Sequence, residues 1–173
     1  MTIRFWSTIL SLGLLLILQV SFIFALPFPF DRLPLVLVIV IYLYQYQNTK
    51  AALWGLICYG FVLDVLGISP APLEILSYTI TSLVLTLLVT HVFTNRSFYG
   101  MLATAIICLA VLTMFELLFS AAASFFSGDV FMWQGLLASQ VWTMAFSCVL
   151  ILFLFPLMHR TYLAVSHAML RRL

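Results

Sequence analysis

Charged residues are scarce in this chain of 173 residues: Lys, Arg, Asp and Glu make up 7% of it, whereas hydrophobic residues make up 65%. A soluble domain of this length needs far more charge to cover a surface that faces water. The net charge is only +2 and there is no basic run, so nothing indicates a nucleic-acid partner. The composition is that of an integral membrane protein.

Cysteine is also rare. Cys58, Cys108 and Cys148 are odd in number, isolated, and each lies inside an apolar segment. This spacing predicts neither a disulfide framework nor a metal site. The sequence also lacks a Gly-rich phosphate loop and a nucleophile with an adjacent base, so we expect no enzyme activity and no cofactor.

The few charges divide the chain into apolar segments close to the roughly 20 residues that cross a hydrocarbon core of about 30 Å. We therefore predict an all-α, polytopic membrane helix bundle with six transmembrane helices. The predicted spans are 5–26, 33–46, 51–66, 73–93, 98–126 and 133–158. The second and third spans are short, and the polar run from Gln45 to Lys50 favours a tight hairpin over one long helix, because such a run is costly at membrane depth.

The basic residues test this count, because cytoplasmic loops carry an excess of Lys and Arg. With the N-terminus in the cytoplasm, Arg32 alone lies outside, next to Asp31. All other basic residues then fall inside: Arg4, Lys50, Arg96, Arg160, Arg171 and Arg172. Both termini are expected in the cytoplasm, and the first segment is expected to be a retained helix rather than a cleaved signal peptide.

The region 159–173 has a different character from the spans. Apolar residues from Met158 to Leu173 share one helical face, while Arg160, His167 and Arg171 share the opposite face. This pattern predicts an amphipathic helix that lies on the cytoplasmic leaflet of the bilayer. A docking site for a cytosolic partner is the alternative.

Three carboxylates fall within or beside the predicted spans, where ionisable groups are expensive and are candidates for function. At a rise of about 1.5 Å per residue, Asp64 and Glu116 are expected toward the outer face, and Glu74 opens the fourth span on the same side. No Lys or Arg within the spans is available to pair with them. For Glu74, an acid at a helix N-terminus is the structural interpretation. For Asp64 and Glu116 a structural and a functional role both remain open.

Several short stretches occur in an order that is typical of a known family. They are Arg32-Leu33-Pro34, an apolar run ending in Tyr42, Trp54-Gly55-Leu56, the stretch from Gly60 to Gly67 that contains Asp64, and Ser69-Pro70. Together they resemble the bacterial rod shape-determining protein MreD family. Glu116 also resembles the acidic position in the fifth span of that family.

The resemblance implies a non-enzymatic scaffold in the bacterial cytoplasmic membrane. Such a scaffold binds the bitopic protein MreC and links the cytoskeletal protein MreB to the transglycosylase and transpeptidase of peptidoglycan synthesis during cell elongation. The candidate partner-binding or intramembrane polar residues are then Asp64, Glu74, Glu116, Gly55, Gly60, Gly67 and Pro70. Lipid contact is certain for such a chain, and a homo-oligomer stays open.

A substrate-binding subunit of an energy-coupling factor vitamin transporter is the alternative, because such subunits also have six spans of similar length. They usually present alanines spaced four apart near the first span. Here that segment has only Gly13 and Ala25 as small residues of this kind.

Overall fold

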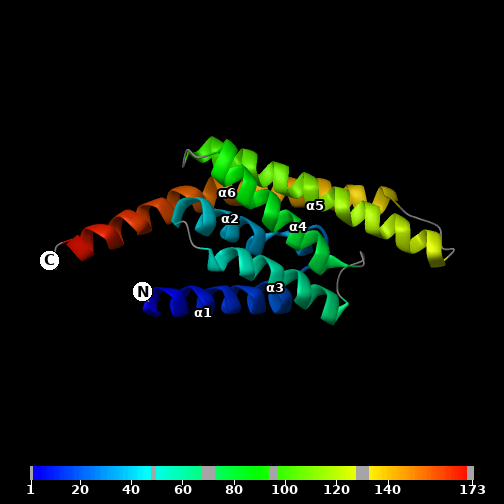
Figure 1. Ribbon diagram of the computed structural model, residues 1–173, viewed down its shortest axis with the longest axis horizontal. Helices are drawn as coiled ribbons and strands as arrows, with labels where there is room; N and C mark the ends of the chain where they lie inside the picture. The colour runs from blue at the N-terminus through cyan, green and yellow to red at the C-terminus, as the bar shows by residue number, and fades with distance from the viewer. Residues whose placement is uncertain (1, 48–49, 68–72, 94–96, 128–132, 171–173) are drawn as a thin grey trace.

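The computed structural model describes the backbone of residues 2–47, 50–67, 73–93, 97–127 and 133–170, all of it helix or connecting turn, without strands (Figure 1). Side chains are described for residues 10–45, 50–67, 73–93, 97–126, 133–154 and 156. The elements are α1 (Thr2–Leu18), a π-helical turn η1 (Gln19–Ile23), a 3-10 turn η2 (Phe30–Arg32), α2 (Leu35–Gln47), α3 (Ala51–Leu66), α4 (Glu74–Leu87), a second π-helical turn η3 (Leu88–Val92), α5 (Phe98–Ser127) and α6 (Trp133–Leu170).

The six long helices alternate in direction, so that the beginning of α1 and the end of α6 lie toward the same end of the molecule (Figure 1). Each occupies one of the segments predicted from the charges. Among the described residues, however, only three helices are long and apolar enough to cross a membrane: Glu74–Val92, Phe98–Phe126 and Trp133–Leu154. The prediction of an all-helical fold is confirmed for the described residues, and three helices are compatible with crossing a membrane; the count of six spans is not confirmed.

The last helix continues past the predicted end of the sixth span. α6 runs from Trp133 to Leu170 with Pro156 inside it, so no helix end separates a span ending at Met158 from the following tail. The side chains beyond Pro156 lie outside the described ones, and the amphipathic character of 159–173 stays a prediction.

α2 lies at the centre of the bundle, where it contacts α1, α3, α5 and α6. Its residues are apolar on all sides of the helix, as expected for a helix that is surrounded by protein. The residues of α2 that are at most 5% exposed are Val36, Leu37, Val38, Val40, Ile41, Tyr42, Tyr44 and Gln45. Burial among other helices agrees with the absence of charged residues from α2.

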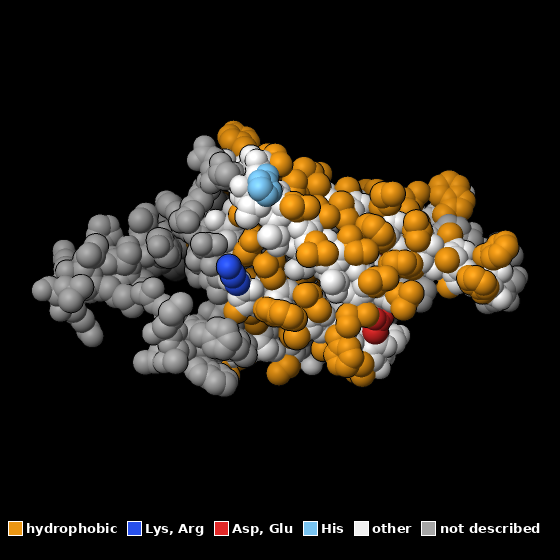
Figure 2. Space-filling view, in the orientation of Figure 1, with side chains coloured by type: hydrophobic (Ala, Val, Ile, Leu, Met, Phe, Trp, Pro, Cys, Tyr) orange, Lys and Arg blue, Asp and Glu red, His pale blue; other side chains and the backbone are white. Residues whose placement is uncertain are grey.

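The outer surface is apolar along the length of the bundle. Figure 2 shows hydrophobic side chains spread along the described part of one face, with few charged side chains among them. Large exposed side chains include Leu83 and Leu87 of α4 and Phe125 and Phe126 of α5. Contiguous apolar surface of this extent is typical of contact with lipid or with partner helices.

Gln19 joins the end of the first helical segment to the beginning of α2. Its side-chain amide donates a hydrogen bond to the Leu33 carbonyl (2.7 Å), and its carbonyl oxygen accepts one from the Leu35 amide (3.2 Å). The side chain is only 2% exposed. The Leu35 amide also donates to the Leu33 carbonyl oxygen (3.1 Å), so the buried glutamine adds hydrogen bonds to backbone groups at the start of α2.

We expect Gln19→Leu to lower the free energy of unfolding by about 1–2 kcal/mol, because it replaces two buried hydrogen bonds by apolar contact. Titration of the purified chain with SDS in mixed micelles measures this change. Leu14→Ala, at an exposed position of α1, is the control and should cost less. Equal stability of Gln19→Leu and the unchanged chain would contradict the assigned role of the amide.

Candidate functional site

α3 and α4 approach each other closely at Gly60 of α3. A Cβ atom at this position would lie 2.9 Å from the Glu74 carbonyl oxygen, 2.9 Å from the Tyr78 Cβ and 3.0 Å from the Ile75 Cα. Two of these three atoms belong to the backbone of α4, which cannot rotate away. Only glycine therefore allows α3 and α4 to pack at this distance.

Asp64 lies one turn beyond Gly60 on α3 and caps the first turn of α4. Its two carboxylate oxygens accept hydrogen bonds from the backbone amides of Glu74 (2.8 Å) and Ile75 (2.9 Å). A carboxylate at a helix N-terminus satisfies amides that lack partners in the helix and interacts favourably with the helix dipole. Asp64 thus serves as an N-terminal cap supplied by a neighbouring helix.

The backbone on both sides of this cap is left-handed. Gly67 ends α3 with φ +59°, and its amide donates to the Asp64 carbonyl oxygen (3.3 Å). Leu73 precedes α4 with φ 62°, a conformation that is unfavourable for a residue with a side chain. The two hydrogen bonds from α4 to Asp64 hold the chain in this conformation.

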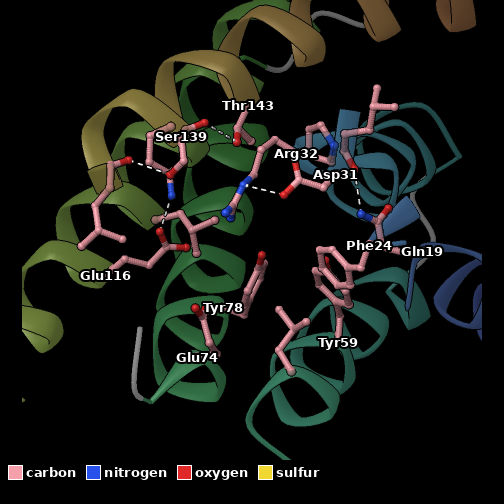
Figure 3. Close-up of a pocket in the computed structure, with 16 residues that line it drawn as sticks. Gln19, Phe24, Asp31, Arg32, Tyr59, Glu74, Tyr78, Glu116, Ser139 and Thr143 are labelled. Atoms are coloured by element: carbon pink, nitrogen blue, oxygen red, sulfur yellow. Dashed lines mark hydrogen bonds and ion pairs between the residues drawn. The ribbon is translucent and has the colours of Figure 1, made fainter. Parts of the chain in front are cut away.

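A cavity of about 220 Å³ lies between the helices on the side of the molecule where α3 ends and α4 begins (Figure 3). Its lining residues come from η1, η2, α3, α4, α5 and α6 and from the turns beside η1 and η2. The lining residues are Gln19, Phe24, Asp31, Arg32, Leu33, Pro34, Tyr59, Leu63, Glu74, Tyr78, Leu112, Glu116, Leu136, Ser139, Gln140 and Thr143. Such a concentration of polar side chains in an otherwise apolar bundle marks a candidate binding site.

The charged residues of the cavity come from three separate elements. Arg32 of η2 pairs with the neighbouring Asp31 (3.2 Å), and the side chains of the pair are 34% and 24% exposed, respectively. Glu74 at the start of α4 is 2% exposed, and Glu116 in α5 is 8% exposed. The amide of Gln140 in α6 donates a hydrogen bond to Glu116. Figure 3 shows the Arg32 side chain extending on the side of the cavity where Glu116 lies.

Aromatic side chains form another part of the cavity wall. The rings of Tyr59 and Tyr78 meet edge to face, with their centroids 5.1 Å apart. Phe24 lies beside Tyr59 in the close-up, and the Tyr78 hydroxyl points into the cavity (Figure 3). Tyr59 directly precedes Gly60 on α3, and Tyr78 of α4 packs against Gly60. The close pairing of the two helices therefore fixes the positions of both tyrosines.

The three carboxylates singled out in the sequence therefore separate into two groups. Glu74 and Glu116 line the cavity together, whereas Asp64 is absent from its lining and bonds to the α4 backbone. The sequence suggested that no basic residue was available to these acids. Arg32, expected outside beside Asp31, in fact shares the cavity with both glutamates.

The small residues predicted as sites have distinct surroundings. Gly60 lies at the α3–α4 contact, and a Cβ at Gly55 would meet the Leu12 side chain of α1 at 3.0 Å. Gly67 has open space around it and is required by its backbone conformation. Pro70 lies outside the described residues.

Sequence reasoning missed most of the polar lining. Gln19 and Gln140 are amides inside long apolar segments, and that position alone was a usable signal, because polar side chains at membrane depth need partners. Ser139 and Thr143 lie next to Gln140 on one face of α6. The contribution of Phe24 and Tyr59 depends on the helix arrangement and had no local signal.

Comparison with known proteins places the chain in no family: no protein-family model matches it, and neither curated proteins nor solved structures yield a match.

Asp64→Ala should lower the free energy of unfolding by about 2 kcal/mol, since it removes the cap from two backbone amides of α4. Asp64→Asn should lose about half as much, because its amide oxygen still accepts one bond. SDS titration in mixed micelles measures both. If Asp64→Ala unfolds at the same point as the unchanged chain, the cap contributes nothing.

Gly60→Ala should destabilise the bundle by about 1–3 kcal/mol, because the added methyl group forces two backbones apart. The chain offers matched controls. Gly55→Ala meets only the flexible end of Leu12 and should cost less, and Gly135→Ala has no atom within 4 Å and should be neutral. The order of the three variants in the same titration tests the contact, and equal effects at all three would refute it.

Proposed function

We propose that the chain is a non-enzymatic membrane scaffold of the MreD type. It binds an MreC-like bitopic protein and through it connects MreB to the transglycosylase and transpeptidase of the elongating cell wall. The scaffold crosses the bacterial cytoplasmic membrane six times and keeps both termini in the cytoplasm. It acts by holding its partners in a fixed arrangement rather than by converting a substrate.

The observation that carries the proposal is that three residues of the stretch resembling the MreD family have structural roles at one place in the fold. Gly60 permits the close α3–α4 pairing, Asp64 caps α4, and Gly67 ends α3. These residues thus form a single local unit, which supports reading them as one motif rather than as scattered matches. A rigid helix pair of this kind suits a scaffold, because partner binding requires a surface that is already formed.

The placement of charge supports the proposed orientation. Exposed Lys50 precedes α3, at the end of the bundle where α1 begins and α6 ends (Figure 1). Arg32 lies at the opposite end and is paired with Asp31. An excess of unpaired basic charge on one side is typical of the cytoplasmic side.

The cavity favours a second candidate, a substrate-binding subunit of an energy-coupling factor type vitamin transporter. Its volume of about 220 Å³ and its convergent polar side chains would suit capture of a small molecule. The two candidates differ in their partners: a single-span wall-synthesis protein for the scaffold, and an ATPase with a coupling membrane protein for the transporter subunit.

Crosslinking in native membranes, followed by purification of the chain and mass spectrometry of its partners, tests the proposal. We expect an MreC-like protein together with the wall transglycosylase and transpeptidase. Gly60→Ala should reduce this capture, and Gly135→Ala should leave it unchanged. Capture of an ATPase and a coupling protein instead would reject the scaffold and establish the transporter subunit.

A further inference from the structure

Glu116 presents a buried carboxylate to the cavity. Its side chain is 8% exposed, and within the described part of the chain its hydrogen bond comes from the Gln140 amide, which occupies one carboxylate oxygen. The Gln140 carbonyl oxygen is itself buried and has no hydrogen-bond partner among the described residues. Glu116 thus lines the cavity with a buried carboxylate that receives no other hydrogen bond among the described residues.

Acidic residues outnumber basic ones in the lining of the cavity. Asp31, Glu74 and Glu116 contribute carboxylates, whereas Arg32 is the one basic residue among the described lining residues. Arg32 already pairs with Asp31. A carboxylate buried in an apolar bundle is costly unless a proton or a cation neutralises it.

The remaining lining narrows the kind of cation. Carboxylate oxygens and the hydroxyl oxygens of Ser139 and Thr143 can accept hydrogen bonds from N–H donors. Among the described residues no cluster of three His, Cys, Asp or Glu side chains could hold a metal ion. The rings of Tyr59 and Tyr78 suit an organic cation, because aromatic faces attract ammonium and guanidinium groups. At about 30 Å³ per water, a cavity of about 220 Å³ has room for a ligand in place of about seven waters.

We propose that this cavity binds a small organic cation that carries protonated amino or guanidino groups. The Glu116 carboxylate accepts its N–H groups, and the tyrosine wall covers its carbon chain. The acidic residues are spread over α4, α5 and η2, which suits an extended molecule rather than a single ion. The proposal is independent of the scaffold function, since a scaffold and a transporter subunit could each hold such a ligand.

Thermal unfolding of the purified full chain in detergent tests the proposal, with putrescine, a four-carbon diamine, as the probe. The uncharged four-carbon diol of the same length is the matched control, and ionic strength is held constant with NaCl. We expect a saturable rise of the unfolding midpoint with the diamine and none with the diol. Equal shifts with both, or no saturable shift with the diamine, would overturn the proposal.

Two variants locate the site. Glu116→Gln should weaken diamine binding by about tenfold or more, the loss expected for a hydrogen bond to a charged group. Ser120→Ala, on α5 one turn farther along and absent from the lining, should bind like the unchanged chain. Equal weakening by both variants would place the diamine elsewhere and reject the site. Because no partner protein is present, failure here and failure of the crosslinking experiment are distinguishable.

Discussion

The arrangement of the candidate site depends on the short distance between α3 and α4 at Gly60. A side chain there would meet the α4 backbone within 3.0 Å, so the pairing exists only because the residue has none. The same contact brings Tyr78 opposite Tyr59 and sets Glu74 at the edge of the cavity. Asp64 then stabilises the beginning of α4, so one helix pair provides both a rigid element and part of the cavity wall.

An apolar surrounding explains why polar side chains occur where they do. Backbone groups at the starts of α2 and α4 cannot rely on water, and Gln19 and Asp64 satisfy them from neighbouring elements. Both side chains bond to the backbone of a neighbouring element. Glu116 differs, because its described hydrogen bond comes from the side chain of Gln140 and the residue lines the cavity. The first two residues therefore have a structural role, whereas Glu116 belongs to the candidate site.

Much of the helix layout could be predicted from the sequence, because the rare charged and polar residues mark the ends of apolar segments. α3 begins and ends as predicted, at Ala51 and Leu66, and α5 begins as predicted at Phe98. The number of membrane spans could not be settled in this way. An apolar sequence is expected both for a helix surrounded by lipid and for a helix buried inside the protein, so it does not distinguish the two. α2 is buried inside the protein.

The candidate site was less predictable. The position of a residue along a helix indicates its depth in the membrane, but it does not indicate which neighbouring helix its side chain faces. Asp64 and Glu116 had equivalent predictions, yet one side chain turns to the α4 backbone and the other to the cavity. Arg32 was counted as a loop charge and instead extends into the cavity. Each outcome depends on which helix lies opposite, and a single sequence contains no direct record of that.

The separation of Asp64 from the cavity changes how loss of function at this position should be interpreted. Asp64 belongs to the motif that resembles the MreD family, so a variant that abolishes activity would invite the conclusion that Asp64 contacts a partner. The two hydrogen bonds to the α4 backbone provide a sufficient structural cause for the same loss. The described hydrogen bond of Glu116 is to a side chain, that of Gln140, and not to the backbone. A phenotype confined to Glu116, with stability retained, is thus the stronger evidence for a working site, because it cannot be explained by unwinding the start of a helix.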